Sequence, residues 1–102
     1  MGNRLRIYNH VNRLFGEGIL GRKAEIRYEQ SGAYRGKPSF TSGSIMEFGK
    51  SEIILENDGH PEKHILLESI ITLSVYLDGE NYPRTIYHKG RVIKRETNKN
   101  LS

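Results

Sequence analysis

The sequence predicts an all-β (mainly β) fold, in which an N-terminal α-helix precedes a strongly bent five-stranded antiparallel barrel with a C-terminal extension. Two observations predict it. The spacing of apolar residues changes from helical before residue 16 to alternating after residue 22, and the later strands are short, with connections rich in turn residues. Short strands in close succession favour an antiparallel meander. The chain has 102 residues, of which 35% are hydrophobic, enough for one small domain.

The first element is a helix over residues 4–15. Its apolar side chains recur at helical spacing, at Ile7, Val11, Leu14 and Phe15. Its polar side chains fall on the other side, at Arg6, Asn9, His10, Asn12 and Arg13. Gly16 then ends the helix. Three turns are not stable alone in water, so we expect the helix to pack on the sheet.

The barrel is predicted over residues 22–77. Apolar and polar residues alternate from Arg22, and the first strand is expected in the segment 24–30. The later strands are expected at about 39–48, 52–57, 64–68 and 70–77. Gly43 lies inside the second strand, where a sheet that closes on itself must bend and where a side chain obstructs the bend. The chain then reverses at Gly49 and Lys50.

The predicted domain covers residues 1–77, and residues 78–102 form a basic extension. Within the extension, two short β-prone runs flank Lys89 and Gly90. The segment 84–95 therefore has two interpretations, an additional hairpin or an arm that reaches a neighbouring molecule.

Charge is distributed unevenly along the chain. The net charge of +4 arises because residues 1–23 hold five basic residues and one acidic residue, residues 84–102 hold six and one, and the middle holds five and ten. Basic ends favour a polyanionic partner such as nucleic acid, although they also keep a small protein soluble. The chain lacks cysteine, a signal-peptide pattern and any long apolar run, so we expect a cytoplasmic protein without a membrane partner.

Over residues 4–77 the sequence resembles the Sm-like (LSm) superfamily, in particular its Hfq-like branch. The residues that match the first family motif are Gly43, Ile45, Phe48 and Asn57, with Ile53, Ile54 and Leu55 as its aliphatic strand. Those that match the second motif are Ser69, Ile70, Thr72 and Leu73. The resemblance implies a closed homomeric ring, in which the fourth strand of one subunit pairs with the fifth strand of the next. It also implies that single-stranded RNA binds between the loop after the second strand and the loop after the fourth.

The sequence departs from the family pattern at this RNA site. Gly49 replaces the usual Asp, Ser51 replaces a bulky group, and Leu67 and Glu68 replace a Lys-His pair. An RNA pocket needs a stacking surface and a donor or cation, and Leu67 and Glu68 supply neither. We therefore expect an altered pocket. The remaining candidate RNA-binding residues in this neighbourhood are Lys50, Ser51 and Ser69.

Two other basic groups are candidate RNA-binding residues. Tyr34, Arg35 and Lys37 combine an aromatic ring with two cations on a glycine-containing loop, which suits single-stranded nucleic acid. The second group lies on the helix and would be repeated as a basic rim in a ring: Arg4, Arg6 and Arg13. Each group also has a simpler interpretation. The loop residues then form an ordinary solvated loop, and the arginines form the solvent side of an amphipathic helix.

No combination of residues predicts catalysis, so we expect a protein that is not an enzyme and uses no cofactor. His60, Glu62 and His64 match no established zinc spacing and are interpreted as a polar turn. Two functions stay open. One is a ring that binds single-stranded RNA through basic helix and loop residues, and the other is a structural or protein-interaction ring that has lost the usual RNA pocket.

Overall fold

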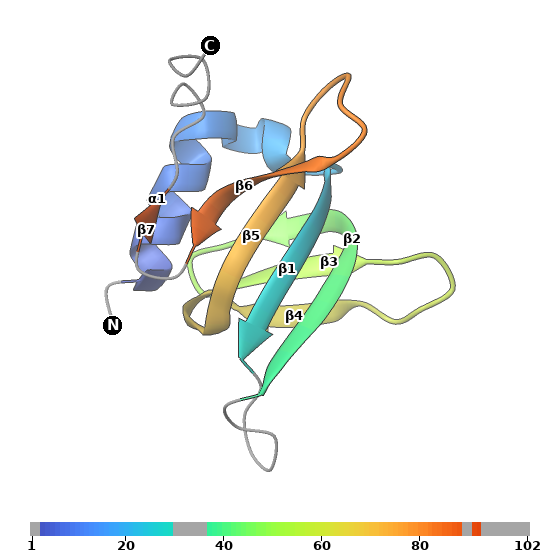
Figure 1. Ribbon diagram of the computed structural model, residues 1–102, viewed down its shortest axis with the longest axis horizontal. Helices are drawn as coiled ribbons and strands as arrows, with labels where there is room; N and C mark the ends of the chain where they lie inside the picture. Colours follow the sequence, from blue (N-terminus) through green and yellow to red (C-terminus); the bar gives the residue numbers. More distant parts are fainter. Residues whose placement is uncertain (1–2, 30–36, 89–90, 93–102) are drawn as a thin grey trace.

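The computed structural model describes residues 3–29, 37–88 and 91–92 (Figure 1). The predicted mainly β fold with an N-terminal helix is confirmed. The elements are α1 (Asn3–Phe15), η1 (Gly16–Ile19), β1 (Lys23–Glu29), β2 (Pro38–Phe48), β3 (Glu52–Glu56), β4 (Lys63–Leu66), η3 (Leu67–Ser69), β5 (Ile70–Tyr76), β6 (Pro83–His88) and β7 (Arg91–Val92), where η marks a 3-10 helix.

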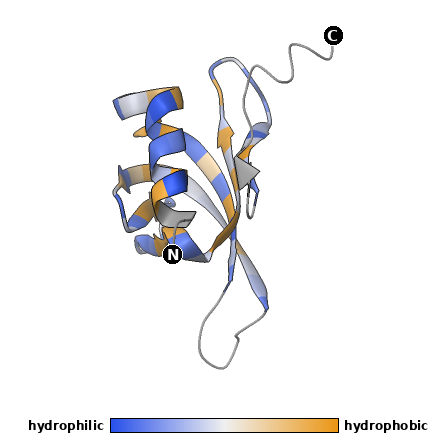
Figure 2. Ribbon diagram, turned by 90° about the vertical axis from the view of Figure 1, so that its left-hand side faces the viewer, coloured by the Kyte–Doolittle hydropathy of each residue, from blue (hydrophilic) through white to orange (hydrophobic). Residues whose placement is uncertain are grey.

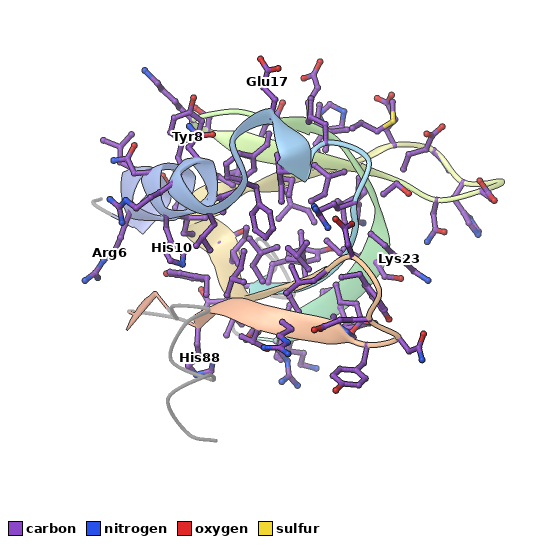
Figure 3. The ribbon with its side chains drawn as sticks, turned by 90° about the horizontal axis from the view of Figure 1, so that it is seen from above. Arg6, Tyr8, His10, Glu17, Lys23 and His88 are labelled. Atoms are coloured by element: carbon purple, nitrogen blue, oxygen red, sulfur yellow. The ribbon has the colours of Figure 1, made fainter. Side chains whose placement is uncertain are left out.

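The strands form one antiparallel sheet in the order β4-β3-β2-β1-β5-β6-β7. The sheet differs from the predicted five-stranded barrel in two respects. It has a sixth strand, β6, and the two-residue β7 beyond it, and it is not closed, because its outermost strands are not paired with one another. The sheet curls so that its two ends face one another. On that side α1 contacts η3 and β7 (Figure 3).

The sheet bends within β2. Residues Pro38 to Ser44 pair with β1, whereas Ser44 to Phe48 pair with β3, so this one strand joins both halves of the sheet. A Cβ atom added to Gly43 would lie 2.6 Å from the carbonyl oxygen of Glu56. This close approach is the physical reason for the glycine predicted at the bend.

One apolar core lies inside the curled sheet. It consists of Ile7, Val11, Ile19, Ala24, Ile26, Ile45, Ile53, Leu55, Ile65, Leu67, Ile70, Leu73, Val75, Ile86 and Tyr87. Apolar and polar segments alternate along the helix and the strands that enclose it (Figure 2). The helix prediction was wrong at His10, which is only 4% exposed. The helix buries more of its surface against the open side of the sheet than its apolar residues alone account for. His10 points toward the β6 side (Figure 3).

The sheet continues beyond residue 77, because β6 pairs with β5 along its length. Tyr87 and His88 then pair with Val92 and Arg91 of β7, which agrees with the hairpin interpretation of this segment. Residues 89–90 and 93–102 lie outside the described ranges. Among the helices that the structure describes, none is both long enough and apolar enough to cross a membrane.

Candidate nucleic-acid interface

Two connections meet beside the N-terminal helix, namely the turn between β2 and β3 and the η3 turn between β4 and β5. The backbone N–H of Leu67 donates to the carbonyl oxygen of Ser51 over 2.9 Å. The backbone N–H of Gly49 donates to the backbone carbonyl oxygen of Glu52 over 2.9 Å. The first bond joins the two turns, and the second closes the turn between β2 and β3. Three predicted site residues therefore gather here: Lys50, Ser51 and Ser69.

An aromatic pair lies at this junction. The rings of Tyr8, from α1, and Phe48, from the end of β2, stack with their centroids 5.6 Å apart and their planes 13° apart. The ammonium group of Lys50 lies 6.0 Å from the centroid of the Tyr8 ring. Both rings are half-buried, whereas Lys50 is exposed. An aromatic surface with an adjacent cation offers stacking to a base and charge to a phosphate.

The residues that replace the family's Lys-His pair have separate roles. Leu67 is fully buried in the core, so its side chain is not available to a ligand. Glu68 is exposed and places a carboxylate on the η3 turn. The hydroxyl of Ser69 donates to the carbonyl oxygen of Leu66 over 2.8 Å, which leaves that hydroxyl able only to accept from a ligand. Among the described residues of the two turns, Lys50 supplies the cation.

The basic residues of the helix are on another side of it. Arg6 and Arg13 are exposed and seven positions apart, so they share one helix face. Arg6 and Tyr8 leave the helix in different directions (Figure 3). Arg4 lies in α1, but its side chain is outside what the structure describes. Within one chain the arginine face and the junction do not converge.

Of the predicted loop site, the structure describes one residue. Tyr34 and Arg35 lie outside the described residues, and Lys37 is exposed directly before β2. Lys50 follows the opposite end of this 11-residue strand. The structure thus brings together Lys50, Ser51 and Ser69, and of the other two groups the residues it describes lie apart from them.

Tyr8 is the residue of the junction that the sequence analysis missed. Its partner Phe48 was matched only as a motif position. The stack joins a helix to a strand 40 positions along the chain, and no local spacing signals such a contact. An aromatic residue next to the apolar stripe of an amphipathic helix was the one available signal, and it fits a core position equally well.

In the polar turn a histidine contacts two carboxylates. The ring of His64 lies between two carboxylates, with Nδ1 3.4 Å from Glu52 Oε1 and Nε2 3.6 Å from Glu62 Oε1. The backbone N–H of His60 donates to the carbonyl oxygen of Asn57 over 2.9 Å. Within the described ranges, no group of three acidic or histidine side chains is placed to hold a metal ion.

Comparisons of the chain with models of protein families, with curated proteins and with solved structures find no match.

Proposed function

We propose that this chain is an Sm-like protein that forms a homomeric ring and binds single-stranded RNA at the junction of Tyr8, Phe48 and Lys50. Support for the Sm-like relationship comes from the leading helix, from the strand bent at Gly43, and from the two turns that meet beside the helix. In the family these two turns contribute the RNA site. The exposed arginines of α1 would then form a rim by repetition around the ring.

The observation that carries RNA binding is the Tyr8–Phe48 stack with the Lys50 ammonium group beside it. Base stacking on an aromatic side chain contributes about 1–3 kcal/mol per base and tolerates any base. Leu67 and Glu68 provide no stacking surface at the family's usual pocket. The Tyr8–Phe48 stack supplies one beside it. The proposed site uses the helix in place of the Lys-His pair.

The test is filter binding of oligo-U and oligo-A at two salt concentrations, with the Lys50→Gln variant. We expect affinity to fall steeply with salt, and Lys50→Gln to weaken binding and reduce the salt slope by about 1 per site. The matched control is Lys23→Gln, since Lys23 is also exposed and lies 5.4 Å from the ring centroid of Tyr76. Equal loss in both variants would contradict the site, and binding without a salt slope would contradict phosphate contacts.

A second function is favoured by one observation, the exposed carboxylate of Glu68 where the family has a cationic pair. A structural or protein-interaction ring without RNA would retain the assembly and tolerate this charge. The same assay distinguishes the two functions, because such a ring has an oligomeric mass but retains neither oligonucleotide on the filter at low salt.

A further inference from the structure

The β5 strand is paired on both sides. β1 lies along one edge, and β6 covers the other from Thr72, opposite His88, to Tyr76, opposite Pro83. The ring contact that the family resemblance implies joins the fourth strand to the outer edge of the fifth. In this chain, β6 occupies that edge, so the same contact would require β6 to leave the sheet.

Two other edges remain unpaired within the described part of the chain. β4 pairs only with β3, which leaves the backbone of Lys63–Leu66 unpaired on its outer side. β7 pairs only with Tyr87 and His88, which leaves the outer side of β6 unpaired from Pro83 to Ile86. Both edges are four residues long, and they lie at opposite ends of one sheet. Unpaired strand edges are templates for pairing with another chain.

We propose that copies of this chain associate head to tail, with β4 of one copy paired antiparallel to the Pro83–Ile86 edge of β6 of the next. This inference rests on the ring of the proposed function and assigns its contact to a different strand. Such a heterologous contact consumes one edge of each type per copy, and a ring leaves neither edge unpaired.

One register matches the faces of the two strands. With Leu66 opposite Pro83, the residues that face each other next are Ile65 and Arg84, and then His64 and Thr85. His64, Leu66 and Thr85 are exposed, and Pro83 shares the outer face of Thr85 two positions away. Ile65 is buried, and Arg84 lies opposite the buried Val75. The register therefore places outer residues beside outer residues and inner beside inner.

A groove and an exposed apolar side chain lie beside β4. The groove is lined by Lys63–Leu66 of β4 and by Tyr28, Glu29 and Ser69. Leu66 is 58% exposed beside it, and Tyr82, which precedes β6, is 65% exposed. In the proposed register the Leu66 side chain lies beside Pro83 and Thr85 of the next copy, so the contact shields it from water.

Disulfide cross-linking tests the register directly, because the chain contains no cysteine. The Leu66→Cys/Pro83→Cys double variant is oxidised and run on a non-reducing gel. Residues directly opposite one another on antiparallel strands bring their Cβ atoms close enough for a disulfide. We expect a ladder of covalent oligomers. The control is Leu66→Cys/Phe40→Cys, since Phe40 is 64% exposed on β2, away from the proposed contact.

Light scattering of the unmodified chain and of Leu66→Glu completes the test. We expect an oligomer for the unmodified chain at micromolar concentration, a shift toward monomer for Leu66→Glu, and no shift for Phe40→Glu. An oligomer without a ladder, or with an equal ladder from the control pair, would overturn the β4–β6 contact and leave the ring in place. A monomeric mass would overturn both the contact and the ring, whereas RNA binding is measured independently by filter binding.

Discussion

The bend of the sheet depends on the absence of one side chain at Gly43. An added Cβ would lie 2.6 Å from the Glu56 carbonyl oxygen, which is backbone and cannot rotate away. We expect Gly43→Ala to destabilise the fold by about 1–3 kcal/mol, the usual cost of overpacking. Urea denaturation of the purified variant measures this free energy of unfolding.

The control for this prediction is Gly18→Ala. Apart from its chain neighbours and the backbone of its own 3-10 helix, no atom lies within 4 Å of a Cβ built on Gly18. Its stability is expected to stay within about 0.5 kcal/mol of the unmodified chain. Equal stability of the two alanine variants would show that β2 can bend without glycine.

Tyr76 makes stability depend on pH at the alkaline end. Burial raises the pKa of the Tyr76 phenol, and so does the hydrogen bond that its hydroxyl donates to Glu25 over 3.1 Å, together with the charge of that carboxylate. The folded chain therefore holds this proton more tightly than the unfolded chain, whose phenol has a pKa of about 10. The stabilisation is fully present below pH about 10 and is lost as pH rises through the higher folded-state pKa.

Unfolding free energies measured from about pH 8 to about pH 11 test this dependence in Tyr76→Phe, which has no phenol to ionise at this position. We expect the variant to be less stable than the unmodified chain at the lower pH and the difference to shrink as pH rises. Tyr82→Phe is the control, because it removes a hydroxyl from a side chain that is 65% exposed. The same pH profile in both variants would exclude Tyr76 as the source.

At the scale of elements, α1 is held by its apolar face against the open side of the sheet. Ile7 and Val11 are both fully buried. Truncating Ile7→Ala should cost about 2–5 kcal/mol, because it removes buried methyl groups and leaves a cavity that the surrounding strands fill only in part. Thermal and urea denaturation report the loss. Leu5→Ala, at a side chain that is 46% exposed on the same helix, should change stability by less than about 0.5 kcal/mol.

The elements up to β5 could be predicted from the sequence, because their signals are local. The helix begins one residue from its predicted start and ends at Phe15, before Gly16 with its φ of +56°. Turn residues and alternation likewise place β2 and β5 within one residue of the prediction. The predicted fourth strand extended too far at its end, because Leu67 alternates like a strand residue but lies in the η3 turn.

Pairing and burial could not be predicted in the same way. That β6 lies on β5 depends on a contact between strands, and the run around Thr85 fits a hairpin or an arm equally well in sequence. The polar character of His10 predicts an exposed side chain, and its burial follows only from the docking of the helix against the sheet. For the candidate site, the meeting of the two turns followed from the family resemblance, whereas the Tyr8–Phe48 stack depends on where α1 docks.

For the whole molecule, the extra strand changes what the sheet presents to solvent. One consequence is that, among the described residues, unpaired backbone edges lie on β4, beside the exposed side chain of Leu66, and on residues 83–86 of β6. The helix covers the open side of the sheet, but among the described residues it contributes no backbone partner to either edge. The stability of a chain built in this way should therefore depend on its own concentration, because association adds free energy that an isolated copy lacks.

Thermal denaturation at several protein concentrations measures this dependence. Above the dissociation constant, a tenfold rise in concentration stabilises each contact by about 1.4 kcal/mol, which raises the midpoint of a domain of this size by roughly 6–7 °C. Leu66→Glu should melt at a midpoint that is lower and independent of concentration, because a carboxylate at the β4 edge opposes pairing with a second copy. Phe40→Glu, which alters an exposed side chain away from both edges, should keep the dependence of the unmodified chain. A midpoint that does not move with concentration in the unmodified chain would mean that each copy is stable with both edges unpaired, and ring assembly would then contribute nothing to its stability.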